Sequence, residues 1–175
     1  MKTLINFFKN IFCDIVIFIP APKQIYFKIN TLKDVQRYLN SIIFINSGGC
    51  GIAALAMFKW LKKNNLIEEN TTNFVFLYKS DDGTDYLNNS SVLKQKSGIP
   101  VAPAHVILFH KGNYIDSEGI VEVNEYHWLQ NVNEENFVVR ANNNLFTWCG
   151  FFDRNNIKDI EKMLEIDMDD ILILN

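Results

Sequence analysis

Apolar side chains recur at helical spacing near the amino terminus. The residues that follow this spacing are Leu4, Phe8, Ile11, Phe12 and Ile15. They predict an amphipathic helix that, together with its connector, occupies residues 1–22 and docks on the core. A helix lying on a membrane surface is the alternative, and the lack of a basic polar face disfavours it. Polar and charged residues also interrupt this stretch before it reaches the length of a membrane span.

A second helix is expected after Pro20-Ala21-Pro22, where proline ends any earlier helix. A short strand over Gln24–Ile29 comes first. Asn30 or Thr31 then caps a helix that runs through Ser41. The residues that mark this helix are Leu32, Val35 and Leu39 on its buried side and Asp34 in its first turn.

The longest apolar run begins at Cys50, directly after Gly48-Gly49. Two glycines let the chain turn sharply, and the residues from Ile52 to Lys63 have high helix propensity with almost no polar interruption. Lysines near its end suit the helix dipole, and Asn64-Asn65 can adopt the left-handed conformation that ends a helix. Because this helix is apolar on nearly every side, we expect it to be central and buried, with Cys50 in its first turn.

Strand-like patterns dominate the chain after this central helix. The predicted strands cover Phe74–Tyr78, His105–His110, Tyr114–Gly119, Ile120–Val123 and Phe137–Arg140. Between Ser80 and Pro103 the sequence is polar and rich in turn signals. This excursion is interpreted equally as one flank of a substrate groove or as surface disorder. A closing helix is predicted over Asn155–Leu164.

Two of these strands form a predicted hairpin around Lys111-Gly112. If this loop has two residues, the expected pairs are His110 with Asn113, Phe109 with Tyr114, Ile107 with Asp116, and His105 with Glu118. Since side chains alternate across a strand, His105 and Asp116 then share one face as diagonal neighbours. A three-residue loop would place Asp116 on the opposite side.

Length and composition bound the class of protein. The chain of 175 residues is predicted to be a single domain, 1–175, that buries a core without disulfides. Its hydrophobic content of 48% is typical of a globular protein, and a net charge of -3 without any Lys/Arg block argues against a nucleic-acid partner. The abundance of Asn, Lys and Ile is typical of an AT-rich genome, such as that of a phage or a low-GC bacterium.

Cysteine usage points to a reducing compartment. The three cysteines are Cys13, Cys50 and Cys149. They are an odd set without metal-ligand spacing, so the sequence predicts neither a disulfide framework nor a metal site. No cofactor is predicted, and a cytoplasmic location fits best.

Cys50, His105 and Asp116 form the candidate catalytic set. The amide N–H groups and the positive dipole end at a helix start favour a thiolate, which makes Cys50 a candidate nucleophile. His105 would take the thiol proton, and Asp116 would fix the imidazole tautomer and stabilise its charge. The structural alternatives are a core cysteine, a core histidine and a turn-flanking acid. Glu118 and Ser117 are rival partners for the histidine.

The motifs Gly49-Cys50-Gly51, Ala104-His105-Val106 and Tyr114–Gly119, in that order, resemble the papain-like cysteine-peptidase superfamily. The superfamily is taken here in its broad sense, which includes cell-wall endopeptidase and transglutaminase-like branches. The resemblance covers residues 46–119. It implies an α+β fold in which a central Cys-bearing helix packs on an antiparallel sheet that carries the His and the Asp.

One departure from the family concerns the oxyanion hole. Papain proper has a Gln six positions before its Cys, and Phe44 stands there in this chain. Asn46 is the candidate oxyanion donor in its place, with Ser47 as the alternative and the backbone N–H of Cys50 or Gly51 as a further contributor. The residues interpreted as structural are His110, His127, Trp128, Trp148 and Cys149.

These features lead to a hypothesis of a cysteine-dependent hydrolase or acyl transferase. It would act on a peptide, isopeptide or side-chain amide of a protein or peptide substrate, through an acyl-enzyme on Cys50. The first alternative is a catalytically silent binding or inhibitory module on a protease-like scaffold. The second is a membrane-surface protein that uses its first helix.

Overall fold

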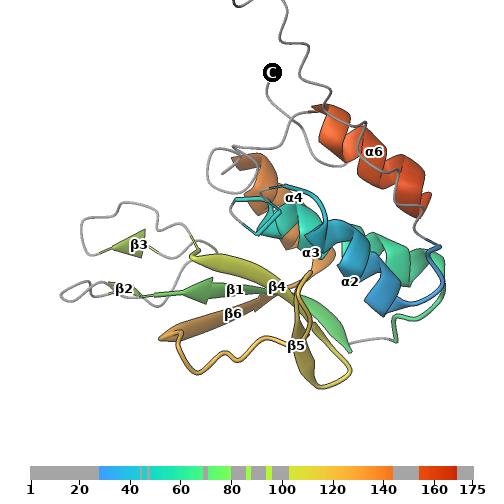
Figure 1. Ribbon diagram of the computed structural model, residues 1–175. Helices are drawn as coiled ribbons and strands as arrows, with labels where there is room; N and C mark the ends of the chain where they lie inside the picture. The colour runs from blue at the N-terminus through green and yellow to red at the C-terminus, as the bar shows by residue number, and fades with distance from the viewer. Residues whose placement is uncertain are drawn as a thin grey trace, which may run out of the picture.

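The computed structural model describes residues 28–43, 45–46, 48–68, 71–79, 86–87, 94–95, 103–143 and 154–168. Within these ranges the chain has an α+β architecture, in which helices pack on one face of an antiparallel sheet (Figure 1). The helix predicted within residues 1–22 lies outside the described residues. No helix in the described part of the chain is long and apolar enough to cross a bilayer.

The main sheet has the strand order β5-β4-β1-β6, and every neighbouring pair is antiparallel. Its strands are β1 (Thr72–Tyr78), β4 (His105–His110), β5 (Asn113–Ile115) and β6 (Trp128–Val132). Strand β1 therefore lies inside the sheet, paired on both edges, and its side chains are buried almost throughout. The strand predicted over Phe74–Tyr78 is confirmed, with an earlier start at Thr72.

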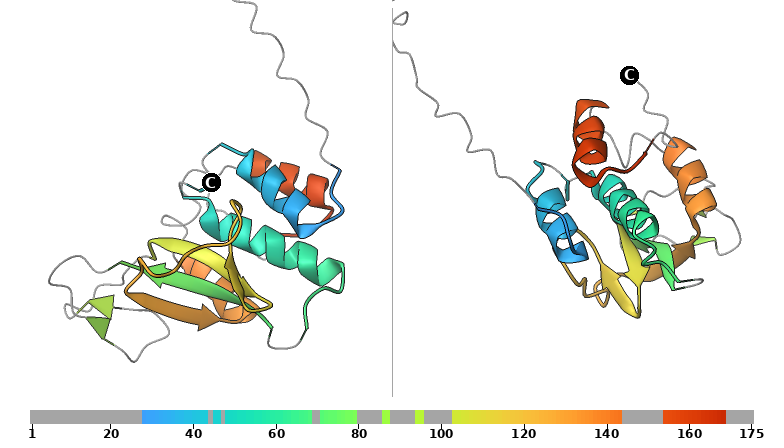
Figure 2. Two further views of the ribbon diagram at one scale, coloured as in Figure 1. Left: turned by 60° about the horizontal axis from the view of Figure 1, so that its bottom comes forward. Right: turned by 90° about the vertical axis from the view of Figure 1, so that its right-hand side faces the viewer.

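Helix α3 (Cys50–Lys63) is the centre of the core, as the apolar run predicts. Leu55, Ala56 and Met57 have no exposed surface, so this helix is buried on all sides along its middle. It contacts β4, α2 and α6, and Figure 2 shows it between the sheet and these two helices. Asn65 adopts a left-handed φ of 55° directly after the helix, which confirms the predicted stop.

Helix α2 (Leu32–Asn40) also forms where the sequence predicts it. Thr31 is its N-cap, and a capping box joins the Thr31 and Asp34 side chains to each other's backbone N–H groups. Val35 and Leu39 are fully buried against α3. Residues 28–30 have no regular structure, so the strand predicted to end at Ile29 is wrong there, and the rest of it lies outside the described residues.

The strand predicted over Phe137–Arg140 is wrong, because these residues belong to helix α4 (Glu134–Asn143). The Asn133 side chain accepts a hydrogen bond from the Asn136 N–H at 2.9 Å, as an N-cap does, and two glutamates occupy the first turn. Phe137 stacks on Phe74 of β1 with ring centroids 4.0 Å apart. A short apolar run is ambiguous between strand and helix, and here packing selected the helix.

The strand predicted over Ile120–Val123 is also wrong. Only Ile120 forms a bridge, with Ile115, and the chain then crosses the sheet without strand pairing. The next strand is β6, which the sequence pattern does not reveal because it alternates weakly and is held by pairing with β1. Helix α6 (Arg154–Leu164) confirms the closing helix and starts one residue earlier than predicted.

The sheet separates two apolar clusters. The larger one lies between the sheet and the helices, where β1 contributes Phe74 and Phe76 and β4 contributes Val106 and Leu108. The smaller one lies on the opposite face around Ile107, and the segment after β5 covers it. The residues of that segment in the smaller cluster are Val121, Val123 and Tyr126.

The predicted polar excursion after β1 is described only in part. Within it, β2 (Tyr86–Leu87) and β3 (Lys94–Gln95) form a separate two-stranded sheet (Figure 1). The remaining residues of the excursion are not described, and its role at a groove stays a prediction.

Candidate functional site

Cys50 is the first residue of α3 and is partly exposed. Gly48 has a φ of 117°, a conformation that L side chains rarely adopt, and Gly49 is the N-cap. The first helical hydrogen bond runs from the Ala53 N–H to the Gly49 carbonyl at 2.9 Å. The thiol therefore stands on a glycine turn at the N-terminal end of a buried helix, as the sequence predicts.

His105 is the first residue of β4 and pairs with Leu77 of β1. Its Nε2 lies 3.0 Å from Oδ2 of Asp116, and both side chains are largely buried. The Cys50 thiol is close enough to the ring to raise the pKa of His105. Because Nε2 is engaged by the carboxylate, Nδ1 is the ring nitrogen that is left for a bond to the thiol.

The two partners determine the protonation of this histidine. Burial lowers the pKa of His105, but the hydrogen bonds to Asp116 and Cys50, together with the charges of both groups, outweigh burial and raise the pKa to about 9. The imidazolium form is thus the stable one at neutral pH. A cationic ring between two groups that can be anionic is the charge arrangement that a thiolate nucleophile needs.

Asp116 begins a tight turn directly after β5. Its Oδ1 accepts the N–H groups of Glu118 at 2.7 Å and Gly119 at 3.1 Å, which leaves Oδ2 for the histidine. Burial raises the pKa of Asp116, but the hydrogen bonds from His105 and from these N–H groups outweigh it, so the pKa lies below its ordinary value. The acid is held as a carboxylate and aimed at the ring.

The predicted hairpin register is confirmed as far as it extends. Lys111-Gly112 forms the two-residue loop, and the pairs are His110 with Asn113, Phe109 with Tyr114, and Leu108 with Ile115. The ladder ends there, because the Asp116 N–H bonds the Gly119 carbonyl at 2.9 Å and closes a turn. The expected pairs of Ile107 with Asp116 and His105 with Glu118 are therefore wrong, although His105 and Asp116 still meet.

Neither rival partner contacts His105. The Glu118 carboxylate accepts a hydrogen bond from Asn46 Nδ2 at 2.9 Å, and the buried Ser117 hydroxyl donates to Asn46 Oδ1. Asp116 is thus the carboxylate that orients the ring. The turn explains this outcome, since it directs one acidic side chain inward and the other outward.

The expectation that Asn46 donates to an oxyanion is not supported. Both hydrogens of its side-chain amide are used, one by Glu118 and the other by Asn40 Oδ1 at 3.0 Å. Asn46 instead joins the loop before Cys50 to the Asp116 turn. The alternative, Ser47, and the departure at Phe44 lie outside the described residues.

The other residues that were named from the sequence, where the structure describes them, have packing or surface positions. His110 Nδ1 lies 2.7 Å from Thr72 Oγ1 at the far end of β4, and burial and the Lys111 charge lower the pKa of His110. Trp128 packs on Tyr78 with ring centroids 5.3 Å apart, as a packing residue does. His127 is exposed. The remaining candidates, Cys13, Cys149 and Trp148, lie outside the described residues.

One residue near the site carries no signal in the sequence. Burial raises the pKa of Tyr126, and so do the charges of Glu125, Asp116 and Cys50. Its phenol therefore lies within electrostatic reach of the candidate site, and Lys79 Nζ is 5.2 Å from its ring centroid. The fold brings Tyr126 there because the segment after the turn crosses the sheet back toward β1, whose Tyr78 carbonyl accepts the His127 N–H.

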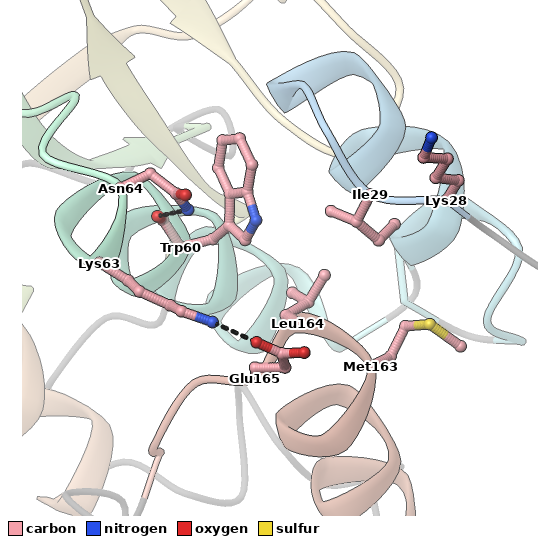
Figure 3. Close-up of a pocket in the computed structure, with 8 residues that line it drawn as sticks. All are labelled: Lys28, Ile29, Trp60, Lys63, Asn64, Met163, Leu164 and Glu165. Carbon is pink, nitrogen blue, oxygen red and sulfur yellow. Dashed lines mark hydrogen bonds and ion pairs between the residues drawn. The ribbon is translucent and has the colours of Figure 1, made fainter.

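A hollow with polar lining lies elsewhere. Lys28, Trp60, Met163 and their neighbours line a volume of about 360 Å³ at the C-terminal end of α3, next to an ion pair of Lys63 and Glu165 at 2.8 Å (Figure 3). Cys50 is at the opposite end of this 14-residue helix, about 20 Å away at 1.5 Å per residue. This hollow is not part of the candidate site.

Within the described ranges, no group of three or more His, Cys, Asp or Glu side chains is arranged to hold a metal ion. Comparison of the chain with protein-family models, with curated proteins and with solved structures finds no match. The site is therefore described by its own geometry, in which an imidazole bonds a carboxylate and a thiol acts electrostatically on the same ring.

Proposed function

We propose that this protein is a cysteine-dependent amide hydrolase or acyl transferase with a papain-like arrangement of Cys50, His105 and Asp116. One observation carries the proposal: the imidazole of His105 lies 3.0 Å from the Asp116 carboxylate, and the Cys50 thiol is close enough to raise the pKa of the same ring. A histidine satisfied by a backbone carbonyl would have fitted a purely structural role. A histidine shared by a thiol and a carboxylate has the connectivity of a nucleophile, a base and an orienting acid.

The first half of the reaction would proceed as follows. His105 holds the proton from Cys50, and the thiolate attacks the carbonyl carbon of the amide, forming a carbon–sulfur bond and a tetrahedral oxyanion. The imidazolium then gives that proton to the amide nitrogen, and the carbon–nitrogen bond breaks to release an amine. Asp116 stays ionised throughout and holds the ring in position.

In the second half, water or an acceptor amine attacks the thioester. His105 removes a proton from the attacking group, and the carbon–sulfur bond breaks to restore the thiol. Water gives hydrolysis, or deamidation if the amide belonged to a side chain, and an amine gives acyl transfer. The expected substrate is a protein or peptide, because an amide carbonyl is the group that this set of side chains activates.

The oxyanion requires N–H donors near the sulfur. The backbone N–H groups at the start of α3 precede the first helical hydrogen bond, which runs from Ala53 to Gly49. Those of Cys50 and Gly51 are the candidates, and the positive end of the helix dipole adds to their effect. Asn46 is assigned no such role, because Asn40 and Glu118 already accept its amide hydrogens.

The test measures the reactivity of each cysteine separately. Wild-type protein is treated with iodoacetamide over pH 5–10 and with a panel of electrophilic amide and peptide probes, and the labelled peptides are identified by mass spectrometry. We expect Cys50 to react at pH 6–7 at least about 10-fold faster than an ordinary thiol with a pKa near 8.5. The Cys50→Ala variant should lose probe labelling, and a Cys149→Ala variant should keep it.

The same measurements can also refute the hydrolase proposal. If Cys50 follows the rate profile of an ordinary thiol, and if Cys50→Ala labels like wild type with the amide probes, the hydrolase proposal is wrong. A silent binding module on a protease-like scaffold would then be the better description.

A further inference from the structure

The turn that carries Asp116 is held from outside by helix α2. The side-chain Nε2 of Gln36 donates to the backbone carbonyl of Asp116 at 2.6 Å and lies 3.4 Å from the carbonyl of Gly119. These residues are 80 and 83 positions apart in the chain, and the contact is partly buried. A single amide group therefore reaches both ends of the turn.

The position of Gln36 is itself fixed. It lies in the middle of α2, between a capping box at Thr31 and the C-cap at Ser41. Its neighbour Val35, like Leu39 one turn on, has no exposed surface and packs into the core with α3. Because the buried side of α2 packs into the core, the Gln36 amide is held in place next to the turn.

Besides the Gln36 contact, the described residues hold the turn through its internal hydrogen bonds and through Asn46. Its internal bonds run from the Asp116 N–H to the Gly119 carbonyl and from the N–H groups of Glu118 and Gly119 to the Asp116 carboxylate. Gly119 has a φ of 140°, a conformation open to glycine and strained for other residues. On the other side, Asn46 binds the Ser117 and Glu118 side chains. Among the described residues, Gln36 is the group outside the turn that hydrogen-bonds the backbone of Asp116 itself.

We propose that Gln36 is a positioning residue that keeps the carboxylate of Asp116 against His105. The role rests on the function proposed above, because it acts through the acid that orients the ring. Without the Gln36 amide, the Asp116 carbonyl loses a hydrogen bond, and the turn can shift away from β4. The bond between the carboxylate and the imidazole then lengthens, and the cationic ring is less well stabilised.

The test compares Gln36→Met with Lys33→Met. Methionine has nearly the length of glutamine and no charge, but it cannot donate a hydrogen bond to the carbonyl. Lys33 is exposed on the same helix, so its replacement controls for the general effect of a methionine on α2. A smaller variant, Gln36→Ala, provides the same loss of the donor if the methionine disturbs folding.

The readout is the titration of the His105 ring, followed by NMR in the full-length protein, together with the rate of Cys50 alkylation. The titratable groups that act on this ring are Asp116 and Cys50, and neither is changed in these variants. We expect Gln36→Met and Gln36→Ala to lower the His105 midpoint by about 0.5–1 pH unit and to slow alkylation at pH 7 about 3- to 10-fold. Lys33→Met should match wild type in both measurements.

If folded Gln36 variants titrate within 0.2 pH unit (roughly 0.3 kcal/mol) of wild type, Gln36 does not position the acid. A wild-type midpoint near the ordinary 6.5 would also overturn the role, since there would be no oriented pair to maintain. If the midpoint shifts as expected but no amide probe reacts with Cys50, the positioning role stands and the proposed amide chemistry fails.

Discussion

The two ring nitrogens of His105 have different roles, and this difference is the main property of the site. Asp116 engages Nε2, so Nδ1 is the ring nitrogen that remains for the thiol. The Asp116 carboxylate divides its oxygens in the same way, one for the ring and one for backbone N–H groups. The backbone N–H groups of the turn thus orient the Asp116 carboxylate, and the carboxylate orients the His105 ring.

Replacing the acid tests this chain directly. In Asp116→Asn the amide cannot stabilise the imidazolium, so we expect the His105 midpoint to fall toward its ordinary value and activity on amide probes to drop on the order of 10²- to 10⁴-fold. Rates with the probes and NMR titration provide the two measurements.

Glu118→Gln is the matched control, because it makes the same change two residues away in a side chain that bonds Asn46. It should keep the midpoint and most of the activity. Equal losses in both variants would show that the charge of the turn, and not the Asp116 contact, sustains the site.

At the scale of elements, the position of the sulfur depends on the packing of whole helices. Helix α3 lies between the sheet and α6, and Lys59 and Lys62 near its end pair with Glu134 of α4 at 3.5 and 2.6 Å. Helix α4 in turn is fastened to β1 by the stacked rings of Phe137 and Phe74. Helix α4, which the sequence pattern does not predict, therefore helps to hold α3, which the pattern does predict.

The assignment of residues 137–140 to helix α4 can be tested by mutation. Phe137 has no exposed surface and Val139 is 53% exposed, so Phe137→Ala should lower the free energy of unfolding by about 3–5 kcal/mol and Val139→Ala by less than about 1 kcal/mol. Urea denaturation of the two variants measures both values. In a strand, Phe137 and Val139 would face the same side, and the two variants would lose similar amounts of stability. Equal losses would therefore contradict the helix.

For the molecule as a whole, the site links stability to pH. The folded pKa of His105, about 9, is above its ordinary value of 6.5, so protonation of the ring favours the folded state. This stabilisation is complete below about pH 6.5 and is lost as the pH rises through about 9. Asp116 has a lowered pKa, so its contribution is present above its ordinary value of 3.8 and is lost as the pH falls further.

We therefore expect the unfolding free energy to fall by on the order of 2 kcal/mol between pH 6.5 and pH 10 through His105 alone. Urea midpoints over this range measure the loss. The difference between wild type and His105→Gln isolates it from other groups, because the variant lacks the titrating ring. A wild-type profile parallel to that of the variant would contradict the assigned pairing.

Local sequence determined the elements whose signals lie within a few residues of one another. The glycine turn and apolar run predict α3, the polar cap predicts α2, and Lys111-Gly112 predicts the loop and register of the hairpin. These features depend on backbone sterics, capping and alternation, which short stretches of chain carry by themselves. The meeting of His105 with Asp116 was predicted because both lie in that one hairpin.

Contacts between distant residues were decided only by the tertiary structure. Whether 137–140 became strand or helix depended on Phe74, and β6 formed because β1 offered it an edge. The choice of Asp116 over Glu118 depended on a turn that ends the ladder, and the amide of Asn46 was taken by groups from two other segments. Such outcomes are set by competition for partners in space, and no local pattern of side chains encodes which partner will be near.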